Sequence, residues 1–259
     1  MLLAVDIGNT HTVAGLFAAG ATIAEPPIAD WRVQTDVEAT RDEVAASLTQ
    51  MLSLYGATLA DVNAAIVSSV VPAQAESYRE FARHYLHVDA TLVGPGIRTG
   101  MPIRSDNPHE VGADRIVNAI AAFERYASAC IVVDMGTATT FDAVSADGAY
   151  LGGAIAPGLG ISIAALVSHA ARLASVELEV PERAIGTNTV TSMQSGAILG
   201  AISQVEGMLS RFRREMPVGH VPAIATGGLS TMIAGHVEGL DDVDPLLTLR
   251  GLQLVAARQ

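Results

Sequence analysis

Two short stretches of the sequence combine an acidic side chain with a glycine turn. In "LLAVDIGNTHTVAGLF" and "CIVVDMGTATTFDAVS", an apolar run of strand length ends in an aspartate, Asp6 or Asp134, and a glycine follows two residues later. A glycine-rich turn between two strands lets the backbone approach a ligand and directs N–H groups at phosphate oxygens, while Thr10 or Thr137 adds a hydroxyl. The two stretches therefore predict two phosphate-binding hairpins.

The aspartates of these hairpins cannot contact phosphate directly, because like charges repel. We expect them to act through water or through a cation such as Mg²⁺ that bridges carboxylate and phosphate. One Asp-x-Gly stretch alone is better explained by an ordinary turn. Its recurrence, together with a downstream "ATGG" that ends at Gly228, favours a nucleotide site.

A third acidic residue, Asp114, lies in the stretch "GADR" before an amphipathic segment. Phosphoryl transfer to an alcohol needs a carboxylate that orients the hydroxyl and takes its proton late. Arg115 beside it could hold a carboxylate substrate with its planar fork. The residues alone leave open a second interpretation, in which Asp114 caps a helix and Arg115 is solvated.

The composition excludes several classes of protein. All 15 basic residues are arginines, so a P-loop lysine, a protein-kinase lysine and Schiff-base chemistry are excluded. The net charge of −12 and the absence of a basic run argue against nucleic acid and anionic membranes as partners. Residues 148–171 lack charged side chains, but their glycines and proline favour a strand, a turn and a core helix over a membrane span.

The single cysteine, Cys130, lies within an expected buried strand, which excludes a disulfide framework. We interpret it as a small core residue and expect a cytoplasmic protein. Met1 to Val5 lack the basic residues of a signal peptide.

Hydrophobic periodicity predicts α/β structure in both halves. We expect strands at 2–6, 11–17, 21–24, 31–35, 64–70 and 88–93, and helices at 41–55, behind the capping box "TRDE", and at 73–85. The second half is expected to repeat this order, with helices at 113–126, 161–175, 189–215 and 245–257 and strands at 129–134, 139–144, 150–155 and 221–226. Gly196 and Gly200 within the longest helix predict close packing against a neighbour.

The proline-rich and glycine-rich loop 94–110 is the expected domain boundary. We therefore predict two similar ribonuclease H-like α/β domains, residues 1–110 and 111–259, with an interdomain cleft.

The order "DIGNT", "DMGTATT", "ATGG" resembles the phosphate 1, phosphate 2 and adenosine motifs of the acetate and sugar kinase, chaperone ATPase and actin superfamily. Within it, the sequence resembles the type III pantothenate kinases. The resemblance covers the whole chain, in order, through "DIGNTHTVAG", "WRVQT", "SSVVP", "NPHEVGADRIVNAIAA", "VVDMGTATTFD", "GGAIAPG", "NTVTSMQSG" and "LTLRGL".

That resemblance implies ATP-dependent phosphorylation of pantothenate to 4′-phosphopantothenate, the first step of coenzyme A biosynthesis. Asp114 would be the catalytic base, and the substrate would be held by Gly112, Ala113, Asp114, Arg115 and Thr189, with Thr187 as an alternative to Thr189. The ATP site would include Asp6, Gly8, Asn9, Thr10, Thr137, Gly227 and Gly228, with Mg²⁺ reached from Asp6 through phosphate or water.

The resemblance also implies a monovalent cation, K⁺ or NH₄⁺, at Asp134 and a homodimer in which the partner subunit completes the pantothenate site. One position departs from many relatives: Ser105 stands where a tyrosine often lines the pantothenate pocket, and its loss removes apolar contact. Two alternatives follow, a nucleotide-binding regulatory homologue without turnover and a kinase of another small alcohol or acid.

Overall fold

The structure is a computed structural model that describes residues 1–94, 97–170, 173, 175–216 and 219–259. It contains two five-stranded sheets with orders β3-β2-β1-β4-β5 and β8-β7-β6-β9-β10. In each sheet three antiparallel strands are followed by strands that pair in parallel. The repeated order confirms the predicted fold class of two similar α/β domains, and the interdomain cleft stays a prediction.

The chain divides into two compact units, residues 1–101, 106–121 and 247–259 in the first and 102–105 and 122–246 in the second. The domain ranges 1–110 and 111–259 stay a prediction, and the units are composed differently because the C-terminal helix contacts β1, β2 and β4. The strands of the first unit are β1 (Leu2–Ile7), β2 (His11–Phe17), β3 (Ala29–Gln34), β4 (Ala64–Ser69) and β5 (Thr91–Leu92).

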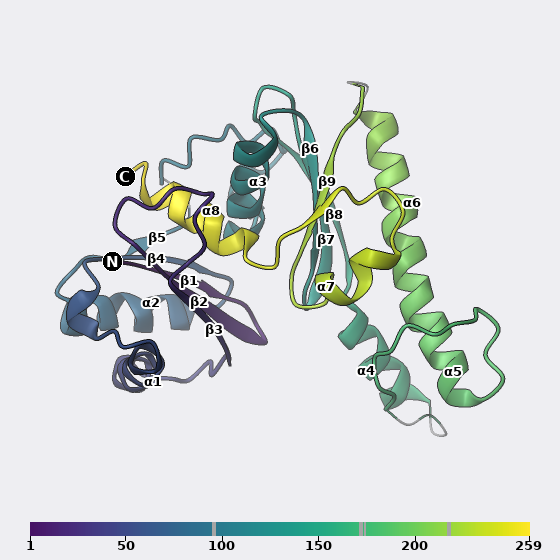
Figure 1. Cartoon of the computed structure of the whole chain (residues 1–259), viewed down its shortest axis with the longest axis horizontal. Helices are drawn as coiled ribbons and strands as arrows, with labels where there is room; N and C mark the ends of the chain where they lie inside the picture. Colours follow the sequence, from purple (N-terminus) through teal and green to yellow (C-terminus); the bar gives the residue numbers. More distant parts are fainter. Residues whose placement is uncertain (95–96, 171–172, 174, 217–218) are drawn as a thin grey trace. The chain divides into compact units, whose positions relative to one another are not determined.

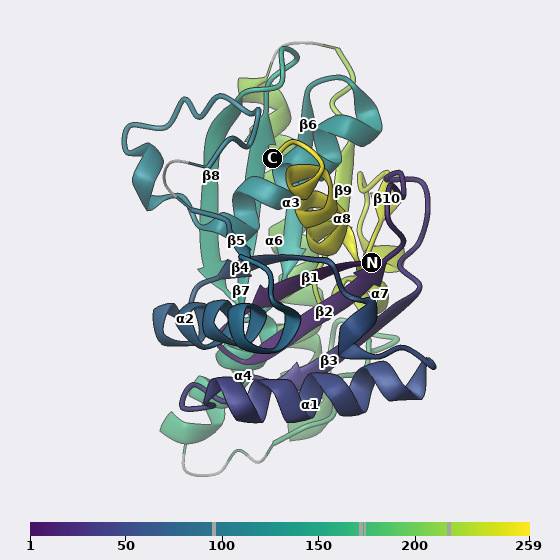
Figure 2. The ribbon, with the colours of Figure 1, turned by 90° about the vertical axis from the view of Figure 1, so that its left-hand side faces the viewer.

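Helices cover both faces of the first sheet. Helices α1 (Arg41–Leu54) and α2 (Pro72–Phe81) lie on one face, and α8 (Leu247–Ala256) lies on the other (Figures 1 and 2). Leu3, Val5 and Ile7 pack into the core on the α1 and α2 side. Because side chains alternate along a strand, Asp6 lies on the opposite face.

The N-terminus of α1 is formed as the sequence predicts. The Thr40 backbone N–H and hydroxyl both donate to Glu43 Oε2 at 2.8 Å, and the Glu43 N–H returns a bond to Thr40 Oγ1. These hydrogen bonds to Thr40 lower the pKa of the Glu43 carboxyl. The capping box is therefore confirmed.

The second unit is built around a core between its sheet and helices. Ile131, Val133 and Met135 pack with Ile202 and Leu209 of α6. The strands are β6 (Cys130–Met135), β7 (Ala138–Val144), β8 (Tyr150–Pro157), β9 (Ala223–Thr226) and β10 (Asp242–Val243). The helices are α4 (Leu159–His169), α5 (Thr189–Gln194), α6 (Gly200–Glu215) and α7 (Ser230–Ile233), and α3 (Ala113–Tyr126) runs through both units.

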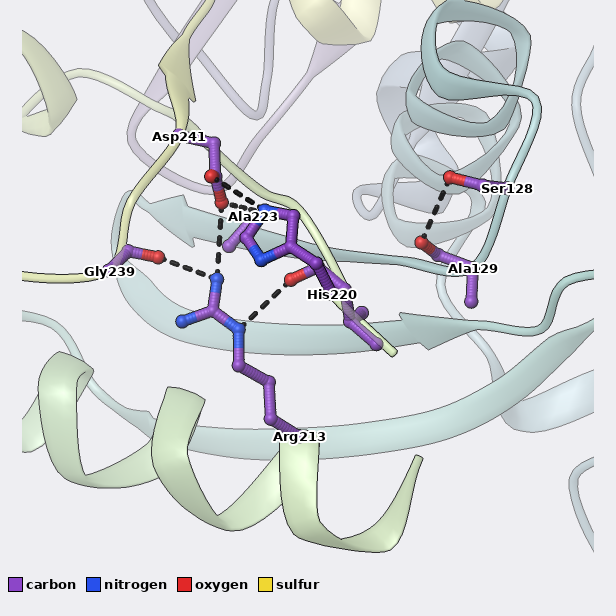
Figure 3. Close-up of polar contacts among 8 residues, drawn as sticks. Ser128, Ala129, Arg213, His220, Ala223, Gly239 and Asp241 are labelled. Atoms are coloured by element: carbon purple, nitrogen blue, oxygen red, sulfur yellow. Dashed lines mark hydrogen bonds and ion pairs between the residues drawn. The ribbon is translucent and has the colours of Figure 1, made fainter. Parts of the chain in front are cut away.

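An arginine near the end of α6 ties that helix to the edge of the second sheet (Figure 3). Arg213 donates to the carbonyl oxygens of Val221 at 2.9 Å and Gly239 at 2.7 Å, and its Nη2 lies 3.1 Å from Asp241 Oδ2. Asp241 also accepts the Ala223 N–H at 2.8 Å. One guanidinium thus holds the chain segments that lead into β9 and β10.

Three predicted elements are wrong in part. Residues 21–24 form turns rather than a strand, because α8 side chains bind their carbonyl groups: Arg250 donates to Ile23 and Gln253 to Ala21. The strand at 88–93 shrinks to β5. The helix predicted at 161–175 is observed as α4, and residues 171, 172 and 174 lie outside the described residues.

The helix predicted at 189–215 contains a π-helical turn. Residues 195–199 have π-helical hydrogen bonding between α5 and α6. Gly196 and Gly200 do not mark a close contact, because a Cβ built at either would meet no described atom within 4 Å. The packing prediction for these two glycines is therefore wrong.

Cys130 is buried, and burial raises the pKa of its thiol to about 12. The thiol is therefore a core group, as predicted. Among the residues that the structure describes, none of the helices combines the length and the apolar character needed to cross a bilayer.

Candidate functional site

The first glycine turn, Gly8 to Thr10, joins β1 to β2 as the sequence predicts. The Gly8 N–H donates to the His11 carbonyl oxygen at 3.0 Å, which closes the hairpin. Asn9 and Thr10 are exposed at its tip, while Asp6 is half-buried near the end of β1. The arrangement presents the backbone of the turn to solvent beside a carboxylate.

A buried hydroxyl lies beside Asp6 in the sheet. Ser68 of β4 is in register with Asp6 across the parallel β1–β4 pair, so the two side chains are on the same face. Ser68 is 0% exposed, and its Oγ has no hydrogen-bond partner in the described part of the chain. An unpartnered buried hydroxyl next to a carboxylate fits the oxygen environment that a hydrated Mg²⁺ needs.

The second unit repeats this arrangement at Asp134. Thr226 of β9 is in register with Asp134, is 1% exposed, and has a hydroxyl without a hydrogen-bond partner among the described residues. Gly227 has φ +90° and packs so closely that a Cβ there would overlap Asp134 Oδ1 and lie 2.7 Å from the Met135 nitrogen. Carboxylate and hydroxyl oxygens of this kind suit a hard monovalent cation.

No group of three or more His, Cys, Asp or Glu side chains that could hold a metal occurs in the described ranges. Mg²⁺ reached from Asp6 through phosphate or water stays a prediction.

The "GADR" stretch forms the N-terminus of α3. Asp114 Oδ1 accepts the Arg115 N–H at 2.8 Å, and Gly112 passes so close that a Cβ there would overlap the same oxygen. Asp114 Oδ2 has no hydrogen-bond partner in the part of the chain described. One oxygen thus fixes the carboxylate while the other can accept a proton. Arg115 is half-buried with a buried Nη2, so the solvated interpretation of this residue is wrong.

Thr189, predicted to contact substrate, is the first residue of α5 and is exposed. The alternative, Thr187, is also exposed, and its backbone N–H donates to Thr191 Oγ1 at 3.1 Å. The helix is capped by Asn188, whose side chain accepts the Thr191 N–H at 3.0 Å. These hydrogen bonds cap α5 but do not distinguish between the two threonines as the substrate contact.

The predicted residues fall into two sets, each within one unit. The first unit brings Gly112, Ala113, Asp114 and Arg115 together at the start of α3 and carries Asp6, Gly8, Asn9 and Thr10 in and beside the first hairpin turn. The second unit packs Asp134 against Gly227 and carries Thr137, Gly228 and Thr189. The roles of these residues stay predictions.

Comparison with known proteins decides the family. The family model of type III pantothenate kinase matches residues 2–211. The chain belongs to the type III pantothenate kinase family. It is 48% identical to the type III pantothenate kinase of Moorella thermoacetica over 258 residues, which are 100% of this chain and 99% of the relative. It is also 48% identical to the one of Streptomyces avermitilis over 100% of this chain and 98% of the relative.

Solved structures confirm the fold of this pantothenate kinase family member. A protein assigned as a 2-dehydro-3-deoxygalactonokinase from Sinorhizobium meliloti superposes with a TM-score of 0.62 at 16% identity, covering 100% of this chain and 96% of that one. The ethanolamine utilization protein EutJ from Carboxydothermus hydrogenoformans has a TM-score of 0.56 at 13% identity, covering 98% and 89%. At these identities the similarity concerns the fold alone.

Sequence analysis missed several residues that support the site. Ser68 lies in "SSVVP" and Thr226 in "ATGG", but the sequence analysis assigns neither residue a role at the site. Their signal was present, because each lies in the last part of a strand that pairs in parallel with an aspartate-bearing strand. Without the register of the sheets, that neighbourhood could not be recognised.

Proposed function

We propose that the chain transfers the γ-phosphoryl group of ATP to the hydroxyl of pantothenate, giving 4′-phosphopantothenate and ADP in the first step of coenzyme A biosynthesis. The observation that carries this proposal is the 48% identity, over the whole chain, to relatives named type III pantothenate kinase. The position of Asp114 at the start of α3 supports it, since the reaction needs a carboxylate near the attacking hydroxyl.

Asp114 is proposed as the base. Its Oδ2 accepts the proton of the substrate hydroxyl while the hydroxyl oxygen bonds to the γ-phosphorus and the bond from that phosphorus to ADP breaks. The Arg115 N–H on Oδ1 holds the carboxylate in place during this transfer. Gly112, Ala113 and the Arg115 side chain, with Thr189 of α5, are proposed to bind the substrate.

The two glycine turns are proposed to hold ATP. Gly8, Asn9 and Thr10 would bind phosphate oxygens through N–H groups and a hydroxyl. In the second unit the nucleotide contacts would come from Thr137, Gly227 and Gly228. Mg²⁺, reached from Asp6 through phosphate or water, would neutralise charge on the transferred group. K⁺ or NH₄⁺ is proposed at Asp134, supported by the buried Thr226 hydroxyl.

An assay of ADP release tests the proposal. With ATP, Mg²⁺ and K⁺, we expect turnover with pantothenate and none above background with other small alcohols and acids. Replacing K⁺ by Na⁺ should reduce the rate, and D134N should be slow in either salt because its cation ligand is lost. Turnover only with another substrate would favour the kinase of another small molecule. ATP binding by calorimetry without turnover would favour the regulatory homologue, for which Ser105 is the motivating residue.

A homodimer is proposed, and exposed apolar side chains of the second unit support it. Ile155 on β8 is 68% exposed, Ile161 and Leu166 on α4 are 48% and 45% exposed, and Val190 on α5 is 51% exposed. Association of two chains would remove such side chains from water, which favours a dimer. Light scattering should give twice the chain mass of 26.8 kDa, and a stable mass of one chain would contradict the dimer.

A cytoplasmic location, inferred from the buried Cys130 thiol, can be checked by cell fractionation.

A further inference from the structure

In each unit, the residue that follows the third strand of the sheet donates a backbone hydrogen bond to a carbonyl oxygen of the glycine turn. Thr35 follows β3, and its N–H donates to the Thr10 carbonyl oxygen at 3.0 Å. Gly158 follows β8, and its N–H donates to the Thr137 carbonyl oxygen at 3.1 Å. The same hydrogen bond is thus made at corresponding positions of two sheets that share one strand order.

Thr35 makes a second contact through its side chain. Its Oγ1 donates to the Gly8 carbonyl oxygen at 2.8 Å and lies 3.0 Å from Thr12 Oγ1. The carbonyl groups on both sides of Asn9 are therefore engaged by a single residue. The backbone N–H of Asn9 enters no hydrogen bond within the described residues.

Gly158 also contacts two carbonyl groups of its turn, through close packing of its backbone. A Cβ at this position would overlap the carbonyl oxygens of Gly136 and Thr137 and lie 2.8 Å from the Thr137 carbonyl carbon. Only a residue without a side chain can approach the turn so closely. The turn itself is closed by the Gly136 N–H, which donates to the Ala138 carbonyl oxygen at 3.0 Å.

These contacts have an electrostatic consequence. A carbonyl oxygen directed at a phosphate would repel it, whereas an N–H group attracts it. We propose that Thr35 and Gly158 are positioning residues for nucleotide phosphate, which hold the carbonyl oxygens of the two turns on the side away from the ligand. This inference rests on the proposed function only in requiring that the chain binds a nucleotide.

The first test compares T35V and T35S. Valine keeps the size and branching of threonine but removes the hydroxyl, so one carbonyl of the turn is released. We expect T35V to weaken ADP binding in the presence of Mg²⁺ about tenfold by calorimetry, and T35S to bind within about twofold of the unmodified chain. In turnover, KM for ATP should rise while KM for pantothenate stays unchanged.

T12V is the matched control for T35V. It removes another buried hydroxyl from the same cluster but leaves the bond from Thr35 to Gly8 intact. We expect ADP affinity within about twofold of the unmodified chain. Equal losses in T12V and T35V, or unchanged affinity in T35V, would overturn the role of Thr35.

The second test replaces Gly158 by alanine, which places a methyl group against the carbonyl oxygens of Gly136 and Thr137. G158A should weaken ADP binding at least tenfold, whereas G160A, two residues away at a position where a Cβ meets nothing within 4 Å of the described atoms, should not. A circular dichroism spectrum like that of the unmodified chain would show that G158A is folded. If folded G158A binds ADP as G160A does, the role of Gly158 is refuted; should G158A not fold, the Thr35 variants decide the proposal.

The two proposals fail in different ways. Since ADP binding is measured without pantothenate, a chain that binds ADP but does not phosphorylate pantothenate contradicts the proposed function alone. Unchanged binding in T35V and G158A contradicts the positioning roles alone. An unmodified chain that binds no nucleotide contradicts both.

Discussion

Replacement of Asp114 by asparagine is expected to lower kcat for pantothenate phosphorylation by about 10² to 10⁴, the range that a general base contributes. Asparagine keeps the shape of the side chain and can still accept the Arg115 N–H through its carbonyl oxygen. It cannot take a proton from the substrate hydroxyl. The fold should therefore persist while the proton transfer is lost, and ADP release measured at saturating ATP and pantothenate checks this.

D106N is the matched control for D114N. Asp106 is an exposed carboxylate in the same unit, in the segment before α3. We expect its replacement to leave kcat within about twofold of the unmodified chain, and ADP binding by D114N to be unchanged. A near-normal kcat for D114N would remove Asp114 from the mechanism and return it to the alternative role of a helix cap.

Replacement of Gly251 by alanine is expected to destabilise the first unit by about 3 kcal/mol, which is the upper part of the usual range for overpacking. Gly251 of α8 packs on α3, and a Cβ there would overlap the Val117 carbonyl oxygen and lie 2.6 Å from its carbonyl carbon. The overlap is with helix backbone, which cannot move aside as the end of a flexible side chain can. Because Val117 is one turn beyond Asp114, kcat should fall as well. Urea unfolding followed by circular dichroism measures the stability.

G207A is the opposite case. Gly207 lies within α6, is exposed, and has nothing among the described atoms within 4 Å of a built Cβ. Alanine there should raise stability by up to about 1 kcal/mol, because it favours the helix over the unfolded chain. Equal urea midpoints for G251A and G207A would show that α8 does not pack on α3 as described.

Local chemistry explains what the sequence could predict. The capping box at Thr40 needs only residues three apart, and the predicted start and end of α3, residues 113 and 126, are both observed. The Asp-x-Gly turns likewise depend on adjacent residues. Each of these features could be recognised without any knowledge of distant partners.

Long-range contacts explain what the sequence could not predict. Nothing in "LTLRGL" indicates that α8 packs on β1, formed more than two hundred residues earlier, or that Gly251 rather than Gly196 or Gly200 marks a close helix contact. Residues 21–24 have strand-like composition, yet side chains of α8 bind their carbonyl groups. In the candidate site, only the strand register shows that the hydroxyls of Ser68 and Thr226 lie beside Asp6 and Asp134.

Identification of the product is the most direct test of the proposed phosphoryl transfer. The chain is incubated with ATP, Mg²⁺, K⁺ and pantothenate, and the products are analysed by mass spectrometry beside a D114N sample. We predict ADP together with pantothenate that carries one phosphoryl group on its 4′ oxygen, and no such product with D114N. Release of ADP without phosphorylated pantothenate would refute the proposed reaction, and equal amounts of product from both proteins would refute the role of Asp114.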